Sequence, residues 1–474
     1  MSQRTGWAPV IDLGEVVPVG AVVPTTPDPV HAPRGVLLAL LALLAAVALV
    51  ADAPHPQLRP VMSTDYAPSN FLSVGDMLYV FQGPYFVPNH VVAYRLSDGR
   101  RAWQVDSPAT ATFERAARVG AASLLIPNPC VGAGPITTVA VDTATGHEMW
   151  RRPGVPEQLV TGGKLVVMSR PGPSNSCGGI FNQAAAPPAW DAVDVATGAV
   201  AWSVQLPRSV RLVPDLDDES RQSVAVAPDG TVVSRDLRTG TVTGYLRLPE
   251  LALPTLPPVA TDEPVVSLPD LTVAGDLALV VDRRSGSARG PGVVVDITAY
   301  DRTVLRERWS VQTDGGQGDD RFRGEYYGVG GCGPVLCMYG PAWVVFLDPR
   351  DGRELWRTRL SVVAAEGANV LLADQEATHG QDPLGGLSVR DLRTGAVRAD
   401  LSGWRALSGS WGRAGPVLGF THANRTWLAR VDLVRATVTS IGAAPGWYGS
   451  CDSQREYVVC RRLDGSLRAW RVTG

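Results

Sequence analysis

The stretch VAVDTATGHEMW at residues 139–150 recurs along the chain and decides its fold. The same order of residues stands at 191–202, DAVDVATGAVAW, and at 345–356, VFLDPRDGRELW. Each copy has an alternating apolar run, an Asp, a Gly four residues later and a Trp four residues after the Gly. Five weaker copies occupy residues 92–103, 233–244, 298–309, 388–399 and 429–440.

The spacing of the copies gives the size of the repeating unit. The Gly position falls at residues 99, 146, 198, 240, 305, 352, 395 and 436, which are separated by 47, 52, 42, 65, 47, 43 and 41 residues. This period is typical of a four-stranded blade of a β-propeller and not of a helical solenoid. The sequence therefore predicts an all-β fold made of repeated blades.

Each copy of the repeat predicts one β-hairpin. The Asp side chain accepts hydrogen bonds from backbone N–H groups two or three residues further on, and the Gly supplies the left-handed conformation that the turn needs. We expect the hairpin to form the two outer strands of a blade. The Trp would bury a large apolar face between adjacent blades, because a single sheet leaves both of its faces uncovered. Five copies carry this blade-packing residue, namely Trp103, Trp150, Trp202, Trp309 and Trp356.

The recurring Asp-x-x-Thr-Gly-x-x-x-Trp unit resembles the pyrroloquinoline-quinone-type (PQQ-like) propeller repeat, over roughly residues 70–474. That resemblance implies a propeller of about eight blades. The chain ends in three strands of a blade, and in this family an N-terminal strand often completes the last one, a role open to the segment near 60–69. The eight copies of the repeat, each predicting one hairpin, together with the three C-terminal strands also allow nine blades. We expect eight, with one degenerate copy merged into a neighbouring blade.

The N-terminal part of the chain predicts a membrane anchor. Residues 1–34 contain six Pro and are expected to be a disordered cytoplasmic tail. The run GVLLALLALLAAVALVA at 35–51 has no charge and no Pro and is interpreted as one transmembrane helix, followed by a linker at 52–69. A signal peptide cleaved at the A-x-A sequence 51–53 and a buried core helix are the alternatives. The formal net charge of −3 gives no reason to expect a nucleic-acid partner.

The six cysteines all follow this apolar run, which places the propeller in an extracytoplasmic, oxidising compartment. Cys332 with Cys337, and Cys451 with Cys460, each follow a similar aromatic segment, so we expect each pair to bridge the first two strands of a blade. Cys130 and Cys177 lie in long loops of consecutive blades and are left for each other. Metal ligation is the alternative, although these spacings without His suit zinc poorly.

Catalytic motifs are sparse. The Gly-x-Gly-x-x-Gly match at 328–333 precedes a strand and is interpreted as a hairpin turn, because a dinucleotide site needs a helix there. The acidic residues at 215–219 lack the spacing of a calcium loop and are interpreted as a solvated loop. Quinoprotein dehydrogenases, which resemble this chain in the repeat, commonly carry two adjacent cysteines beside the cofactor, and no two are adjacent here. We therefore expect no cofactor and no enzymatic activity, with a quinoprotein dehydrogenase as the alternative.

The expected function is a protein-binding or scaffolding module of the cell envelope, with a sensor or accessory domain of an envelope complex as an alternative. In a propeller, the loops between the second and third strands lie on the face opposite the repeat turns. Here they are long and irregular and occupy residues 83–89, 127–135, 170–188, 283–292 and 375–386. Such loops are often functional, and tolerated surface insertions are the alternative. Aromatic residues at their edges give the candidate ligand face, centred on blades one to three, as Tyr85, Phe86, Phe181 and Trp190.

Overall fold

The computed structural model describes most of the chain after residue 56. The described residues are 57–68, 70–83, 90–107, 113–127, 136–160, 162–170, 189–205, 211–213, 219–227, 229–252, 269–285, 292–317, 328–340, 343–374, 386–407, 416–422, 424–454 and 456–473. The predicted tail at 1–34 and the predicted transmembrane helix at 35–51 lie outside them. Among the described residues, no helix is both long enough and apolar enough to span a bilayer.

Antiparallel β-sheets of four strands make up almost all of the described chain, and sheets 1 to 5 come first. Sheet 1 contains β2 (Asn70–Val74), β3 (Met77–Gln82), β4 (His90–Arg95) and β5 (Arg101–Asp106). Sheet 2 contains β6 (Phe113–Val119), β7 (Ala122–Pro127), β8 (Thr137–Asp142) and β9 (Glu148–Pro153). Sheet 3 contains β10 (Val155–Val160), β11 (Leu165–Arg170), β12 (Ala189–Asp194) and β13 (Val200–Gln205), with β15 (Glu219–Ser220) added parallel to β10. Sheet 4 contains β14 (Arg211–Val213), β16 (Gln222–Val226), β17 (Thr231–Asp236) and β18 (Val242–Arg247), followed by the 3-10 helix η1 (Pro249–Leu251). Sheet 5 contains β19 (Asp270–Ala274), β20 (Leu277–Ser285), β21 (Gly292–Asp301) and β22 (Glu307–Gln317).

Sheets 6 to 9 follow the same plan. Sheet 6 contains β23 (Gly328–Cys332), β24 (Val335–Tyr339), β25 (Val344–Leu347) and β26 (Glu354–Thr358). Sheet 7 contains β27 (Ser361–Glu366), β28 (Asn369–Ala373), β29 (Leu387–Asp391) and β30 (Val397–Asp400). Sheet 8 contains β31 (Arg405–Ala406), β32 (Val417–His422), β33 (Arg425–Asp432) and β34 (Thr437–Pro445). Sheet 9 contains β35 (Tyr448–Gln454), β36 (Tyr457–Arg462), β37 (Leu467–Thr473) and, from the other end of the chain, β1 (Gln57–Ser63).

The sheets close into a ring through their apolar faces. In the described chain, each buried apolar cluster joins two consecutive sheets; Tyr79 and Leu125, for example, belong to the cluster between sheets 1 and 2. The cluster that contains Leu78 of sheet 1 and Val459 of sheet 9 joins the last sheet to the first. Because every sheet has a neighbour on both faces, the fold is an all-β propeller.

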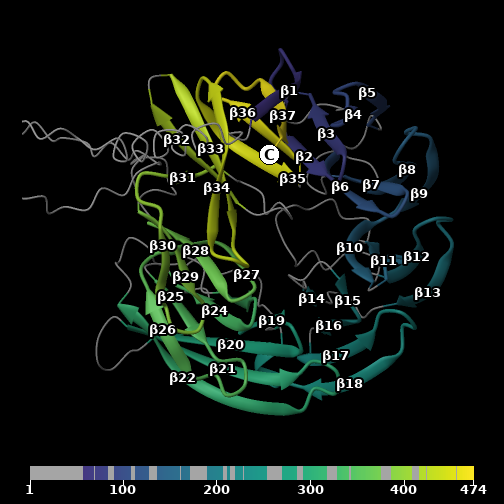
Figure 1. Cartoon of the computed structure of the whole chain (residues 1–474). Helices are drawn as coiled ribbons and strands as arrows, with labels where there is room; N and C mark the ends of the chain where they lie inside the picture. Colours follow the sequence, from purple (N-terminus) through teal and green to yellow (C-terminus); the bar gives the residue numbers. More distant parts are fainter. Residues whose placement is uncertain are drawn as a thin grey trace, which may run out of the picture. The chain divides into compact units, whose positions relative to one another are not determined.

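The last sheet is completed by the N-terminal strand. In Figure 1 the purple strand β1 lies among the yellow C-terminal strands, and β1 pairs antiparallel with β37, from Gln57 opposite Thr473 to Ser63 opposite Arg468. An N-terminal strand was expected to do this near 60–69. The range predicted as a linker, 52–69, therefore contains a strand of the propeller.

The described chain has nine sheets, where we expected eight blades. All eight copies of the repeat have a sheet of their own, including the weak copies at 233–244 and 429–440, so that no copy is merged. The C-terminal strands with β1 then form the ninth sheet. The expectation of eight was wrong because it treated weak conservation of the turn as loss of a whole sheet.

The repeat hairpins bring each Trp onto the turn of the next sheet. In sheet 2, Trp150 lies opposite Ala140, and a β-bulge follows between Ala140 and Val141. A Cβ built on Gly198, in the turn of sheet 3, would lie 2.6 Å from Cγ of Trp150. Gly198 has a φ of +71°, a conformation that Gly adopts without strain. Gly is therefore favoured here for two reasons: its backbone conformation, and the absence of a side chain that would collide with Trp150.

The same five Trp side chains are anchored by hydrogen bonds. Each indole Nε1 donates to the carbonyl oxygen of the residue that follows the repeat Asp in the next sheet, over 2.8 to 2.9 Å. The pairs are Trp103 to Thr143, Trp150 to Val195, Trp202 to Leu237, Trp309 to Pro349 and Trp356 to Leu392. A buried indole is thus satisfied as a donor while its ring fills the space between sheets.

Where the Trp is missing, other residues fill the same place. Between sheets 4 and 5, Gly244 occupies the Trp position and the buried Leu305 occupies the Gly position. A Cβ on Gly244 would lie 2.6 Å from the carbonyl oxygen of Thr303, which shows how closely the backbones approach. Between sheets 7 and 8, both positions are Ala, at 399 and 436, and both lie at the shared cluster.

Two disulfide bonds lie where the sequence predicted them. Cys332 of β23 is bonded to Cys337 of β24, and Cys451 of β35 is bonded to Cys460 of β36. Both bonds join the first two strands of a sheet, and their sulfur atoms are therefore not available as metal ligands. Cys130 and Cys177 lie outside the described residues, so their pairing remains a prediction.

We predict that the Trp contact is a main source of stability. Replacing Trp150 by Ala removes the indole from the cluster between sheets 2 and 3 and leaves a cavity, which should lower the free energy of unfolding by about 3–5 kcal/mol. Val200→Ala, on the exposed side of the next sheet, should change it by less than about 0.5 kcal/mol. Urea unfolding followed by circular dichroism measures both; equal effects of the two substitutions would contradict the prediction.

Candidate functional site

The ring has two faces that differ in their connections. Because the strands of each sheet alternate in direction, the links from first to second and from third to fourth strand lie on one side, which we call the turn face. The links from second to third strand, and the links between sheets, lie on the other side, the loop face. In sheet 8, residues 433–436 belong to the turn face, and Asn424 belongs to the loop face.

On the turn face, the polar groups of the repeat bind one another. The Asp142 Oδ1 atom accepts hydrogen bonds from the backbone N–H of Thr145 and from its Oγ1 atom, both over 2.8 Å, and from the N–H of Ala144. Thr145 Oγ1 in turn accepts from the N–H of His147. These hydrogen bonds, with that from the Thr145 hydroxyl the strongest, lower the pKa of Asp142.

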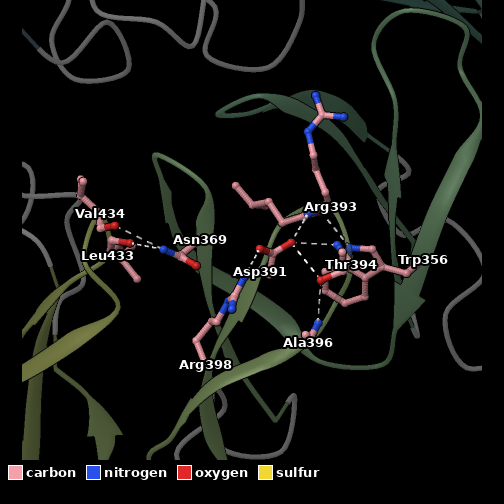
Figure 2. A network of polar contacts seen from close by, with 10 residues as sticks. Trp356, Asn369, Asp391, Arg393, Thr394, Ala396, Arg398, Leu433 and Val434 are labelled. Carbon is pink, nitrogen blue, oxygen red and sulfur yellow. Dashed lines mark hydrogen bonds and ion pairs between the residues drawn. The ribbon is translucent and has the colours of Figure 1, made fainter.

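Figure 2 shows this arrangement in sheet 7, with an arginine added. Asp391 Oδ2 accepts from Arg398 over 2.7 Å, while its Oδ1 atom accepts from the backbone N–H and the hydroxyl of Thr394. The Arg398 hydrogen bond is the largest influence and, with Thr394, lowers the pKa of Asp391 to about 2. Figure 2 also shows Trp356, from sheet 6, beside this turn.

These contacts engage the polar groups of the repeat motif on the turn face. In the described turns that carry the complete motif, the Asp oxygen, the Thr hydroxyl and the Gly backbone are all used within the hairpin or against the Trp of the preceding sheet. The polar groups of the motif therefore serve the hairpins and the contacts between sheets.

Most of the long loops predicted as the ligand face lie outside the described residues, and so do Tyr85, Phe86 and Phe181. Trp190 is described, and the expectation for it was wrong. It is the second residue of β12 and only 2% exposed, packed in the cluster between sheets 3 and 4. Its position directly after a long loop suggested exposure, but its strand directs the indole against sheet 4.

The described ends of two predicted ligand loops are held by polar contacts. At residues 170–188, Arg170 Nε lies 2.7 Å from Asp191 Oδ2, and Ser203 Oγ donates to Asp191 Oδ1 over 2.6 Å. At residues 83–89, the ring of His90 is hydrogen-bonded to Gln82 across β3 and β4. Strand residues thus fix the points at which both loops leave the sheets.

An exposed aromatic stripe crosses sheet 8 near the loop face. Phe420 of β32 and Trp427 of β33 are cross-strand partners, 38% and 46% exposed. The ring of Trp404 lies 6.3 Å from that of Phe420, and the His422 ring is stacked parallel to Phe420 at 6.4 Å. The stripe continues the face of sheet 8 that packs against sheet 7, because Leu418 and Ala429, on the same side of the strands, belong to the cluster between these sheets.

Further exposed apolar side chains lie on the loop face at the link between sheets 8 and 9. Trp447, 48% exposed, belongs to the link between sheets 8 and 9, and its carbonyl oxygen accepts from the N–H of Leu463, which is also exposed. The same link approaches sheet 8, where Gly446 N–H donates to the carbonyl oxygen of Asn424. We call the stripe of Trp404, Phe420 and Trp427 on sheet 8, without these two side chains, the aromatic surface.

Sequence reasoning missed the aromatic surface. The signal was present, since Phe420 and Trp427 become cross-strand partners once the hairpin turn is placed at 423–424. Their exposure depends on how far sheet 7 extends beside them, which the sequence of sheet 8 alone does not reveal. The described residues contain no group of three or more His, Cys, Asp or Glu side chains placed to hold a metal ion.

No family model and no curated protein matches the chain. Solved structures match at low similarity. The crystal structure of BamB from Moraxella catarrhalis matches with a TM-score of 0.37 and 12% identity, over 84% of this chain and 80% of that one. A computationally designed protein, Ika8, gives 0.41 and 10% over 87% and 99%, and a europium-containing methanol dehydrogenase gives 0.36 and 12% over 85% and 81%. We take neither function nor site residues from these structures.

The turn motif predicts a specific titration. In the wild type, the Asp391 carboxyl should titrate near pH 2, and Arg398→Gln should move its pKa up toward 3.8, because the variant loses the strongest hydrogen bond to the carboxylate. Because the pKa of Asp391 is lower in the folded protein than in the unfolded chain, its carboxylate stabilises the fold above about pH 4, and this stabilisation is lost as the pH falls toward 2. Carboxyl NMR titration measures both values. Arg393→Gln is the control, because Arg393 lies in the same turn but pairs with Asp348; an unchanged Asp391 pKa in Arg398→Gln would refute the assignment.

Proposed function

We propose that the chain is a membrane-anchored, extracytoplasmic β-propeller that binds a protein partner through its loop face, without catalysing a reaction. The observation that carries this proposal is the aromatic surface. Large aromatic side chains that stay exposed next to one another are typical of protein-binding sites, where Trp and Tyr carry much of the binding energy.

The contrast between the two faces supports the choice of the loop face. The turn face uses its Asp, Thr and Gly residues for hairpin and sheet contacts, as in the turn of Asp391. The loop face carries the aromatic surface and the ends of the long predicted loops. The proposed location of the binding surface differs from our expectation from sequence, because its described part lies on sheet 8 and not on sheets 1 to 3.

The proposed compartment is supported by the disulfide bonds. Buried disulfides such as Cys332–Cys337 and Cys451–Cys460 persist in oxidising surroundings outside the cytoplasm. The apolar run at 35–51 would then anchor the chain, with the short tail at 1–34 in the cytoplasm.

Partner binding is tested by crosslinking in membranes followed by co-purification. We expect the double variant Phe420→Ala/Trp427→Ala to lose at least tenfold of the crosslinked partner, because it removes two adjacent apolar contacts. Tyr245→Ala, a matched exposed aromatic on the outer strand of sheet 4, should capture as much as the wild type. Thermal unfolding of all three proteins establishes that they remain folded.

Two results would contradict this function. Full partner capture by the double variant, with loss on substituting the turn residues Thr145 and Thr239 by Val, would place binding on the turn face. A stoichiometric quinone spectrum after reconstitution with pyrroloquinoline quinone and Ca²⁺ would favour the dehydrogenase instead.

The topology is tested with protease added to intact cells. We expect the propeller to be digested and an N-terminal fragment containing residues 35–51 to remain in the membrane, because the anchor lies before the propeller. Permeabilised cells serve as the control for access to the tail at 1–34. Recovery from the medium of a mature protein that starts at Pro54 would disprove the retained anchor.

A further inference from the structure

The ring has one line along which it opens without breaking a peptide bond. The strand β1 pairs with β37 but continues through residues 64–69 into β2, so it belongs covalently to sheet 1. The strands β35 to β37 follow sheet 8. We call the contact between β35–β37 on one side and β1–β2 on the other the closing line.

Backbone pairing and apolar packing hold the closing line. Beyond the β1–β37 ladder, Thr64 N–H donates to the carbonyl oxygen of Leu467, and Leu467 N–H donates to Thr64 Oγ1, both over 3.0 Å. Val61 of β1 covers Gly99 in the turn of sheet 1, in the place that a Trp takes at other sheet contacts. These contacts do not depend on pH.

A buried carboxyl group also crosses the closing line. Asp452 of β35 is 2% exposed, and its Oδ2 atom accepts hydrogen bonds from the backbone N–H and the hydroxyl of Ser73 in β2, over 2.7 and 2.6 Å. Gln454 Nε2 donates to the carbonyl oxygen of Ser73 over 2.8 Å. The other carboxyl oxygen, Oδ1, is buried and has no hydrogen-bond partner among the described residues.

The ionisable groups on the elements packed against this carboxyl group are one histidine, one tyrosine and four arginines. The strand β2 has no ionisable residue, and β32 carries only His422, at its loop-face end. The strand β36 carries Tyr457, Arg461, which lies over the ring of Phe71, and Arg462. From sheet 8, Arg405 donates to the carbonyl oxygen of Tyr448, and Arg430 donates to those of Gln454 and Tyr457.

Burying an ionised carboxylate with one oxygen that has no partner is costly, and protonation removes the part of this cost that comes from the buried charge. Opening the closing line also removes it, because the carboxylate then meets water. Protonation and opening therefore compete as ways to relieve the same penalty. We propose that Asp452 makes closure of the ring pH-sensitive, so that the closing line is tight when Asp452 is neutral and opens more often when it is ionised.

The direction of the effect follows from linkage. Burial is the largest influence on Asp452 and raises its pKa above the ordinary value of 3.8, so the closed ring binds the proton more tightly than the open one. The stabilisation of the closed ring by the proton on Asp452 is complete below pH 3.8 and is lost as the pH rises through the raised pKa of Asp452. Within that interval, the open population grows up to tenfold for each pH unit.

Hydrogen exchange of the full-length protein between pH 4 and 8, corrected for intrinsic rates, tests the proposal. We expect the opening of β1 and β37 amides to rise with pH in the wild type and to be independent of pH in Asp452→Asn. Asp464→Asn is the matched control, because Asp464 is exposed in the adjacent β36–β37 turn and is bonded only to Ser466 and Arg462 at that turn; it should keep the wild-type slope. An equal slope in Asp452→Asn, or no slope in the wild type, overturns the proposal.

Direct titration keeps the test informative if Asp452→Asn does not fold. In the wild type, the Asp452 carboxyl carbon should titrate above pH 3.8 by NMR. Ser73→Ala removes one donor to the carboxylate and should raise that pKa further. A wild-type pKa at or below 3.8, or a lower value in Ser73→Ala, overturns the proposal as well.

Discussion

The packing of one Trp indole on the backbone of the next turn is the contact on which the rest of the ring depends. A four-stranded sheet buries too little apolar surface to be stable alone, so each sheet needs a neighbour whose distance and rotation are fixed. The indole fixes both: its ring fills the space above a Gly such as Gly146, and its N–H binds a carbonyl oxygen of the same turn. The hydrogen bonds of the Asp and the Thr hold that turn in shape to receive it.

This contact also explains how the ring tolerates sheets that lack the motif. Between sheets 4 and 5, the large side chain belongs to the later sheet instead of the earlier one. Gly244 of sheet 4 stands at the Trp position, and Leu305 of sheet 5 stands at the Gly position. At the contact of sheets 9 and 1, Val61 lies over Gly99 instead. What is kept is the filled volume between sheets and not the residue that fills it, as expected where packing density governs stability.

The sequence predicted the hairpins, which depend on nearby residues, but it did not predict contacts between segments that are far apart in the chain. The Asp and Gly positions predicted the outer hairpins, and the aromatic segments before the cysteine pairs predicted both described disulfides, because strand alternation and turn chemistry act over a few residues. The sheet count was missed because we expected one weak copy of the repeat to be merged, although each of the eight copies has its own sheet. Trp190 and Trp427 both stand in strands, yet one is buried and the other exposed; the difference lies in the neighbouring sheet. Asp452 stands in a sequence, Ser-Cys-Asp-Ser-Gln, that gives no sign of burial, which depends on β2.

The strand β1 imposes an order on biosynthesis. It leaves the ribosome before every other strand of the described chain, but its partner β37, centred about 400 residues later, is among the last to emerge. The first sheet therefore waits, with one face uncovered, until β35 to β37 have been synthesised. Long-range pairing of this kind slows folding and leaves unpaired strands open to misassembly. A propeller closed in this way makes its final contact from its first strand, so its assembly depends on keeping β1 free of other partners until β37 arrives.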